Sequence, residues 1–491
     1  MRRFKLAGVL VAAVLAISLS MSASHATDTA PAAATNHWLT DSSGRVVILH
    51  GLNQVYKIAP YTPSSGGFSD DDAAFLQANG FNAMRVGVIW AAVEPHPGVY
   101  DDTYLAQVAQ TVQTLANHGI VSLIDFHQDL YNEEFQGEGA PAWATQDGGL
   151  GLLNLPLGFP LNYFANLAEN HAWDAFWSNA PAPDGIGLQN HYAAAVAHVA
   201  GYFKANNSVV GYEVMNEPWP GTGFALCLNP LIGCPLFDQL GLSAFYKRVN
   251  TAVRAVDTTH VLWLEPNTLF NQGMPTAITL PGKNTGFAFH DYCGVESETG
   301  MNLTCPQQDS LTWGNASRFS AANHVPAMLT EFGATNDAAN LTEVEDFADQ
   351  NMMSWLEWAY TGNDITSSSS SGQALVYNPS LPPTGANVNT AKLQVLARPF
   401  PQAVAGTPTS WSFSGGVFTL SFSTQRADGT GSFGPGSQTI ISTPAVEFPN
   451  GYAVNVTGGT VASAPNAALL KIVESPGATS VTVTVSPLPH S

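Results

Sequence analysis

Two glutamates that follow apolar, β-type runs carry the clearest chemical signal in this sequence. Residues 211–219 read G-Y-E-V-M-N-E-P-W, so Glu217 ends a short apolar run and stands beside Asn216. Pro218 has no amide hydrogen for a sheet ladder, so we expect the strand to stop there. Glu331, in L-T-E-F-G, ends a second apolar run. Two carboxyl groups held at strand ends are suited to proton transfer to a sugar oxygen and to attack at a sugar carbon.

The elements that would hold these glutamates form a repeated pattern of buried strand, polar loop and amphipathic helix. Candidate strands cover residues 46–53, 83–90, 120–127, 209–216, 260–265, 286–290, 325–331 and 353–360. Helical patterns between them cover 70–79, 103–118, 190–206, 243–256 and 341–351. Continuous apolar strands that alternate with helices indicate a parallel sheet, and eight such units predict an α/β fold, the (β/α)8 TIM barrel. An open doubly wound sheet is the alternative, but no Gly-rich phosphate loop follows the first strand.

In a barrel, reactive side chains gather at the carboxyl ends of the strands. The polar and aromatic residues in or at the ends of the expected strands are Arg85, His127, Asn216, Glu217, His290, Tyr292, Glu331 and Trp358. Each of them alone has a structural explanation, such as an ion pair or a buried core histidine. Their shared position favours one site. Glu213, Glu265 and Glu357 are rival carboxylates, but none has an amide, His or Tyr neighbour at a strand end.

Composition indicates an exported protein. The chain has 37 acidic and 16 basic residues, a net charge of −21, and only 11% charged residues, which argues against nucleic acid or an anionic membrane surface as a partner. Arg2, Arg3 and Lys5 precede an apolar run, and Ser24-His25-Ala26 offers a cleavage site, so residues 1–26 are expected to be a signal peptide. An uncleaved anchor is the alternative, although the run is shorter than the ~20 residues that span a bilayer.

The cysteines agree with an oxidising compartment. Local spacing favours the pairs Cys227 with Cys234 and Cys293 with Cys305. A metal site is the weaker reading because no histidine cluster accompanies them, and no cofactor or metal is expected elsewhere.

With these residues in view, the chain resembles the cellulase-type glycoside hydrolases of family 5, which are retaining (β/α)8 glycosidases. Within that family it is similar to the secreted endoglycoceramidases of actinobacteria. The motifs that carry the resemblance are L-H-G-L-N-Q-V-Y-K (49–57), D-F-H-Q-D (125–129), G-A-P-A-W (139–143), V-M-N-E-P-W (214–219), L-E-W-A-Y (356–360) and R-P-F-P-Q-A-V-A-G-T-P (398–408). It implies a barrel over residues 36–396.

The resemblance also implies roles for individual residues. Glu217 would be the acid/base and Glu331 the nucleophile, Asn216 would hold the sugar 2-hydroxyl, and Arg85 and Tyr292 would keep Glu331 ionised. The side chains expected around the sugar next to the scissile bond are Lys57, His127, Asp129 and Trp358. Lys57 and Asp129 belong to the endoglycoceramidase-like branch alone.

Two apolar loops suggest the chemical nature of the leaving group. The long loop from Gln128 to about Gly187 carries L-G-L-L-N-L-P-L-G-F-P-L-N-Y-F (150–164) and then Trp177, a further candidate for substrate binding; a second apolar loop covers 224–235. Such loops suit a lipid aglycone. Alternatively, they pack over each other as the core of a lid.

Beyond Arg398 the pattern changes to short alternating segments, which predict a β-sandwich over residues 397–491. We expect it to buttress the barrel rather than to bind membrane or glycan. We therefore expect a secreted, monomeric enzyme without an obligate protein partner. It would cleave the glycan–ceramide bond of a glycosphingolipid in a micelle or membrane. The alternatives are an endoglycanase (a glucanase or mannanase), a glucosidase acting on glucosylceramide or a steryl glucoside, and a catalytically inactive glycolipid-binding protein.

Overall fold

The computed structural model describes residues 31–294, 304–362 and 370–489. The expected signal peptide, residues 1–26, and part of the Ser-rich loop after residue 366 lie outside these ranges. Among the described residues, none of the helices combines the length and apolar character needed to cross a bilayer.

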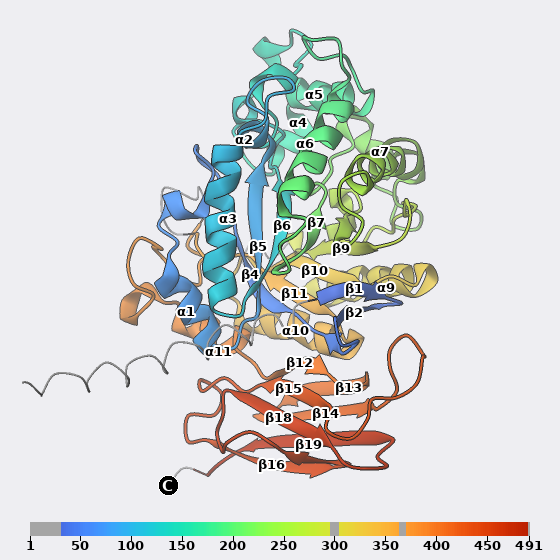
Figure 1. Cartoon of the computed structure of the whole chain (residues 1–491). Coiled ribbons are helices and arrows are strands. Elements are labelled where there is room, and N and C mark those ends of the chain that lie inside the picture. Colours follow the sequence, from blue (N-terminus) through green and yellow to red (C-terminus); the bar gives the residue numbers. More distant parts are fainter. Residues whose placement is uncertain (1–30, 295–303, 363–369, 490–491) are drawn as a thin grey trace, which may run out of the picture.

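Across the described residues, eight parallel strands close into a barrel, as predicted from the strand and helix alternation (Figure 1). Every residue of these strands is buried, because helices cover the outside and side chains fill the inside. The barrel strands are β4 (His50–Gln54), β5 (Ala83–Ile89), β6 (Val121–His127), β7 (Val209–Glu213), β8 (Val261–Leu264), β9 (Thr285–Asp291), β10 (Ala327–Phe332) and β11 (Ser354–Glu357).

Helices and short turns connect the strands. The helices are α1 (Asp70–Ala78), α2 (Trp90–Val93), α3 (Asp102–Asn117), α4 (Leu161–Ala165), α5 (Leu167–Trp177), α6 (Leu188–Phe203), α7 (Ser243–Arg254), α9 (Cys305–Asn323), α10 (Ala338–Asn351) and α11 (Thr390–Leu396). The remaining helical turns are η1 (Pro63–Gly66), η2 (Glu133–Phe135), η3 (Ala142–Ala144), η4 (Gly151–Leu153), η5 (Gly221–Cys227), η7 (Thr268–Gln272) and η8 (Gly385–Asn387), and the π-helical turn η6 (Phe237–Leu242) runs directly into α7.

The first expected strand is wrong as a single element. Residues 46–53 contain β3 (Val46–Val47) and then β4, and β3 pairs with β2 (Trp38–Asp41) and with β12 (Phe400–Val404) rather than with the barrel. Both segments are apolar and buried, so their composition does not reveal that the chain changes sheets between them.

The C-terminal region is an antiparallel two-sheet domain, as predicted, and its larger sheet also takes in the N-terminal strands. That sheet has the order β1-β2-β3-β12-β15-β18-β17 and the smaller one β13-β14-β19-β16. Their remaining bounds are β1 (Pro31–Thr35), β13 (Thr407–Ser414), β14 (Val417–Ser423), β15 (Gln438–Ser442), β16 (Tyr452–Thr457), β17 (Gly459–Val461), β18 (Leu469–Glu474) and β19 (Ser480–Pro487). Buried and exposed residues alternate along β19, because one face packs on the domain core and the other faces solvent.

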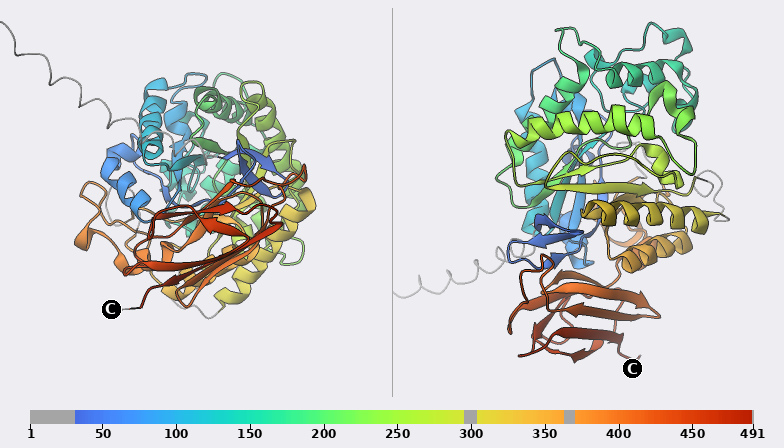
Figure 2. Two further views of the ribbon diagram at one scale, coloured as in Figure 1. Left: turned by 60° about the horizontal axis from the view of Figure 1, so that its bottom comes forward. Right: turned by 90° about the vertical axis from the view of Figure 1, so that its right-hand side faces the viewer.

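This domain lies beneath the barrel, at the end where the strands begin (Figures 1 and 2). Gly80, just before β5, accepts hydrogen bonds from Gln402 (3.2 Å) and Ser442 (3.3 Å), and His50 stacks on Phe400. Helices α4 and α5 lie at the opposite end. The contacts are those of a buttress, as the sequence analysis expected.

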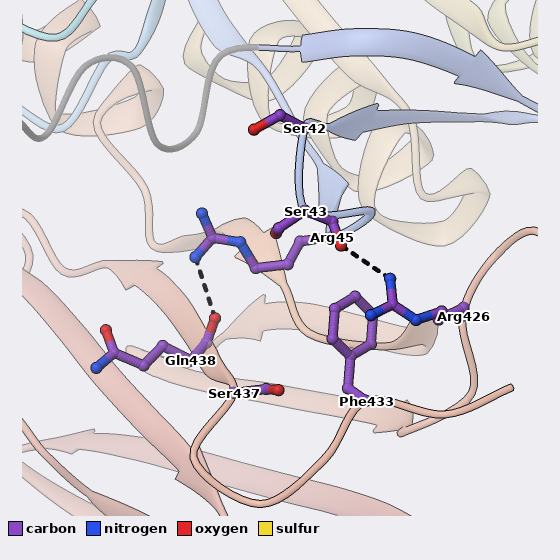
Figure 3. Close-up of a pocket in the computed structure, with 7 residues that line it drawn as sticks. All are labelled: Ser42, Ser43, Arg45, Arg426, Phe433, Ser437 and Gln438. Atoms are coloured by element: carbon purple, nitrogen blue, oxygen red, sulfur yellow. Dashed lines mark hydrogen bonds between the residues drawn. The ribbon is translucent and has the colours of Figure 1, made fainter.

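Two arginines tie the turn after β2 to the C-terminal domain (Figure 3). Arg45 Nη1 donates to the carbonyl oxygen of Gln438 at 3.2 Å, and Arg426 Nη1 donates to that of Ser43 at 2.8 Å. Arg426 also lies over the ring of Phe433. These contacts fix the N-terminal strands to the domain that they complete.

Candidate active site

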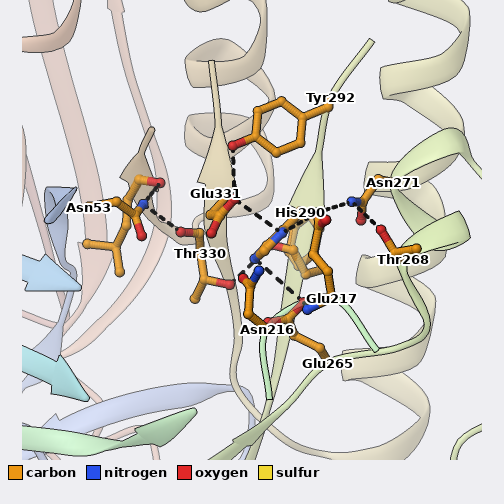
Figure 4. Close-up of polar contacts among 12 residues, drawn as sticks. Asn53, Asn216, Glu217, Glu265, Thr268, Asn271, His290, Tyr292, Thr330 and Glu331 are labelled. Carbon is orange, nitrogen blue, oxygen red and sulfur yellow. Dashed lines mark hydrogen bonds and ion pairs between the residues drawn. The ribbon is translucent and has the colours of Figure 1, made fainter. Parts of the chain in front are cut away.

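The side chains of Glu217 and Glu331 both point toward His290 (Figure 4). His290 joins them: its Nδ1 lies 2.9 Å from Glu217 Oε1 and 3.5 Å from Glu331 Oε2. One ligand atom from each of these three side chains lies within 4.8 Å of the others. This spacing fits the separation of about 5 Å between the carboxyl groups of a retaining glycosidase, and is too short for the water that an inverting enzyme places between them.

The backbone around Glu217 differs from the sequence expectation. Strand β7 ends at Glu213, five residues before Pro218, so the proline does not end it. Glu217 has φ of +42°, which is unusual for a residue with a side chain. Its amide donates to Glu265 Oε2 at 3.1 Å, and its Oε1 accepts from Asn271 Nδ2 at 2.6 Å. The turn therefore aims the carboxyl group into the barrel mouth.

Glu331 is held from two sides. Arg85 Nη1 donates to its Oε1 at 2.5 Å, and the Tyr292 hydroxyl donates to its Oε2 at 2.9 Å. Burial raises the pKa of Glu331, while the positive charges of His290 and Arg85 oppose that shift. Arg85 and Tyr292 were expected to keep Glu331 ionised. The contribution of Arg85 has the predicted sign, but the loss of hydration outweighs it.

Arg85 organises the floor beneath the two glutamates. It is fully buried, and its guanidinium reaches Glu213 (2.6 Å), Asp125 (3.0 Å) and the Asn216 side-chain oxygen (2.8 Å). Burial opposes the charged form of Arg85, but the surrounding carboxylates raise its pKa well above the usual value. This fork of donors also fixes Asn216 beside Glu217, which is a positioning role that a single lysine charge would not fill.

Asn216 keeps capacity for a ligand. Its Oδ1 accepts from Arg85, and its Nδ2 donates to the Gln128 carbonyl at 2.9 Å. An amide nitrogen carries two hydrogens, so one remains for a sugar hydroxyl.

A second cluster lies beside the catalytic pair and contains the other expected sugar contacts. Lys57 forms an ion pair with Asp129, and its ammonium lies 4.6 Å from the centre of the Trp358 ring. The His127 ring stacks against Trp358 at 5.3 Å. Glu138, which the sequence analysis did not select, lies 3.7 Å from both Lys57 and His127.

Burial and neighbouring charges strongly shift the pKa values of two side chains in this second cluster. Burial opposes protonation of His127, but Asp125 and Asp129 raise its pKa to about 10. Burial raises the pKa of Glu138 to about 8, with Lys57 opposing the shift. The cluster therefore presents an aromatic face beside charged donors and acceptors, which suits stacking and hydrogen bonding to a sugar ring.

Trp177 is not brought to the catalytic pair. Its indole donates to the Trp219 carbonyl at 2.7 Å, and its ring packs on Trp173 and Phe237. Trp173 is fully buried. Trp177 thus lies in the packed underside of the loops that cover the barrel mouth, as the lid alternative expected.

Besides Glu138, sequence reasoning missed Asn271 and Asn53, and it set Glu265 aside as a rival carboxylate. Asn271 follows β8 in the turn η7 and bonds Glu217, Glu265 closes β8 and accepts the Glu217 amide, and Asn53 on β4 accepts from Arg85 at 3.0 Å. Asn53 lies in a barrel strand and Glu265 directly follows one, so strand position was an available signal for these two, whereas Asn271 lies in the turn η7, away from the strand end. Glu357, by contrast, bonds Lys392 at 2.6 Å on α11 and does not join the site.

Both expected disulfides are present, Cys227–Cys234 and Cys293–Cys305. The first closes the apolar loop after β7. The second joins the segment after Tyr292 to the start of α9.

The grouped carboxylates and imidazoles could hold a cation on geometry alone. Such groups are His127 with Asp129 and Glu138, and His290 with either Glu213 and Glu265 or Glu217 and Glu331. In the first group the Lys57 ammonium already neutralises the carboxylates, and in the others the Arg85 guanidinium does so. These fixed positive charges disfavour a metal ion there.

Comparisons with known proteins agree with this geometry. The family described as Cellulase (glycosyl hydrolase family 5) matches residues 41–364, and the glycoside hydrolase family 5 C-terminal domain matches residues 398–485. Endoglycoceramidase I of Rhodococcus hoagii is 32% identical over 91% of this chain and 86% of its own.

Two solved structures of endo-glycoceramidase II from Rhodococcus sp. have the same overall fold. The lactosyl-enzyme intermediate is 29% identical and the ganglioside GM3 complex 28%; each has a TM-score of 0.74, and the alignments cover 92% and 93% of this chain and 100% of the other. The matches span both the barrel with its paired glutamates and the domain beneath it. The chain therefore belongs to glycosyl hydrolase family 5.

Proposed function

We propose that this protein is a retaining endo-β-glycosidase that cleaves the bond between the glycan and the ceramide of a glycosphingolipid. The observation that carries the proposal is the pair Glu217 and Glu331, which share His290 within 4.8 Å at the barrel mouth. Relatives named endoglycoceramidase align over most of the chain, and one related structure holds a lactosyl-enzyme intermediate.

In the first step Glu331 Oε2 or Oε1 attacks the anomeric carbon of the sugar. The bond between that carbon and the ceramide oxygen breaks, and Glu217 gives its proton to the departing oxygen, so ceramide leaves as an alcohol. Arg85 and Tyr292 hold the attacking carboxylate through separate oxygens and orient it. His290 lies between the two glutamates and keeps their separation fixed.

In the second step Glu217, now ionised, takes a proton from water, and the resulting hydroxide attacks the anomeric carbon. The ester to Glu331 breaks, and the glycan leaves with retained configuration. Asn271 donates to Glu217 Oε1 and holds this carboxyl group in position. The cycle restores both carboxyl groups.

The cluster around Trp358 gives the sugar end of the site its selectivity. We assign the face of Trp358, with Lys57, His127 and Asp129, to the sugar beside the scissile bond. Lys57 and Asp129 neutralise one another, so both can exchange part of their contact for sugar hydroxyls without leaving an isolated buried charge. The apolar loops beside Glu217 favour a lipid leaving group over a further sugar, which places an endoglycanase second.

Product analysis tests the substrate class. The full-length protein is incubated with a detergent-solubilised ganglioside, with glucosylceramide and with a soluble cello-oligosaccharide. Release of intact oligosaccharide together with free ceramide supports the proposal. Cleavage of the soluble oligosaccharide alone favours an endoglycanase, and cleavage of glucosylceramide alone favours a glucosidase.

Leaving-group dependence tests the role of Glu217. In Glu217→Gln, cleavage of the ceramide bond should fall by about 10²–10⁴-fold, because ceramide is a poor leaving group and needs the proton. Glycosylation by an aryl β-lactoside with an acidic phenol should fall far less. Equal losses with both substrates would contradict the assignment of Glu217 as the acid.

We also propose that the protein is exported and acts as a monomer. The basic and apolar N-terminal stretch, the two disulfides and the low charged fraction support export. N-terminal sequencing of the protein from culture medium should place the first residue after Ala26. Light scattering should give the mass of a single chain, whereas an intact N-terminus or a dimer would contradict these two assignments.

A further inference from the structure

Two segments above the barrel expose large apolar side chains to an unusual degree. On the first, residues 150–167, Leu152 is 97% exposed and Phe159 is 61% exposed. On the second, residues 226–240, Leu231 is 85% exposed and Leu226 is 76% exposed. We call these two segments together the apolar crest. Contiguous exposed apolar surface of this kind marks an interaction site.

The crest carries no basic residue, and its one acidic residue, Asp238, is buried. No Lys, Arg, Asp or Glu occurs between residues 148 and 168 or between 218 and 237, in a chain whose net charge is −21. An exposed protein surface normally carries charges of both signs. The absence of exposed charges lowers the free-energy cost of moving these two segments from water into a less polar medium.

Packed aromatic rings, of which Trp219 is buried, hold the two segments side by side. Phe164 of the first contacts Phe224, just before the second, with ring centres 5.6 Å apart, and both rings contact Trp219. The disulfide Cys227–Cys234 closes the loop that carries Leu231. The packed rings and the disulfide therefore hold in place the segments that carry the exposed leucines.

The crest adjoins the catalytic acid. Trp219 lies two residues after Glu217 and stacks on Tyr163 at 5.0 Å. The aglycone oxygen protonated by Glu217 is therefore next to the foot of the crest. The C-terminal domain lies at the other end of the barrel (Figure 1) and points away from whatever the crest contacts.

We infer that the apolar crest docks this protein onto an electrically neutral lipid surface and inserts Leu152 and Leu231 among the acyl chains. The inference rests on the proposed function, because the ceramide of a glycosphingolipid is embedded in such a surface. A crest without cations, on an acidic chain, has no attraction for anionic lipids. Apolar side chains at the interface supply the binding instead.

Vesicle binding tests this inference independently of catalysis. The full-length protein is mixed with phosphatidylcholine vesicles that contain no glycosphingolipid, and bound protein is separated by flotation. Leu152→Asp and Leu231→Asp should each lower partitioning about tenfold, because an inserted leucine is replaced by a charge. Val461→Asp, on an exposed position of β17 beneath the barrel, is the matched control and should partition as the unaltered protein does.

Added phosphatidylglycerol should weaken binding, and salt should not abolish it. Equal partitioning of the crest variants and the control would overturn the inference. So would binding that requires anionic lipid, or a dimer in light scattering that Leu231→Asp dissociates.

A second readout separates this inference from the proposed function. The crest variants should cleave vesicle-embedded ganglioside about tenfold more slowly and a soluble aryl β-lactoside at an unchanged rate, which also shows that they are folded. If the unaltered protein releases no oligosaccharide from detergent-solubilised ganglioside, the proposed function fails. The flotation result still tests whether the crest binds a lipid surface.

Discussion

Two buried arginines, one at each end of the barrel, hold clusters of carboxylates. Arg85 lies at the mouth and reaches Asp125, Glu213, Glu265 and Glu331. Arg398 lies beneath the barrel and reaches Glu345, Asp346 and Asp349 on α10. In both clusters the carboxylates raise the pKa of the arginine against the effect of burial.

The clusters differ in what lies beyond the carboxylates. At the mouth, the far oxygen of Glu331 meets Tyr292 and His290, and through His290 a second catalytic carboxyl group. Beneath the barrel, Asp349 accepts from Trp411 at 2.6 Å, and Arg398 donates to the Phe413 carbonyl at 3.0 Å, so that cluster joins α10 to β13. A buried arginine with carboxylates is thus not sufficient evidence for an active site. The cluster at the mouth differs because two catalytic carboxyl groups share a histidine there, at the open end of the strands.

The largest expected effect separates the two clusters by chemistry. Glu331→Gln should lower kcat by about ten-thousandfold or more, because it removes the nucleophile, and should keep the protein folded. Steady-state kinetics and a thermal melt measure both. The control is Glu357→Gln, a buried strand glutamate that bonds Lys392 outside the site; its folded fraction should keep near-normal kcat. Wild-type activity in Glu331→Gln would contradict the mechanism.

The next effect is on stability. Arg398→Met should lower the free energy of unfolding by about 3–5 kcal/mol, because it leaves buried carboxylates without their cation. At temperatures where the variant is folded, kcat should be unchanged. Denaturant unfolding checks the first statement and kinetics the second. Arg426→Met, at the rim of the same domain (Figure 3), should cost no more than about 1 kcal/mol. A loss of kcat in folded Arg398→Met would show that the two ends are coupled.

A smaller effect concerns the ionisation of Glu331. Activity should fall as pH falls through the pKa of this nucleophile, which burial raises. Tyr292→Phe removes a donor that favours the charged form, so the acidic limb of kcat/KM should move to higher pH, with about tenfold lower activity on that limb. Tyr360→Phe removes a comparable hydroxyl that bonds Asp72 away from the site, and its profile should match the wild type. If the acidic limb does not move in Tyr292→Phe, the result would contradict the inference that Tyr292 favours the charged form of Glu331.

The smallest effect is the pH dependence of stability in the lower cluster. Burial raises the pKa of Glu345 from 4.5 to about 8, with Arg398 opposing the shift. Between those pH values the unfolded chain has released a proton that the folded chain retains, so stability falls as pH rises. Glu345→Gln should make that fall shallower in melts across this window. A steeper or unchanged slope would show that Glu345 is ionised in the folded protein.

Local patterns were enough to predict the barrel and most of its reactive residues. The strands at 83–90 and 120–127 were recognised because unbroken apolar runs between helices indicate burial on both faces, and the structure shows that burial. The disulfides followed from short spacing. Residues 46–53 were misassigned because two strands of similar composition stand next to each other and enter different sheets.

Residue type and order along the chain therefore established the fold class and pointed to Glu217 and Glu331, since strand periodicity and strand ends are local properties. Closure of the barrel brought Arg85 to Glu331, 246 positions away, and placed Asn271 against Glu217, 54 positions away. The direction of the Glu331 pKa shift also required the folded chain, because it depends on whether lost hydration outweighs the charges of Arg85 and His290. Distances and burial of this kind arise from packing between distant segments, which no local pattern records.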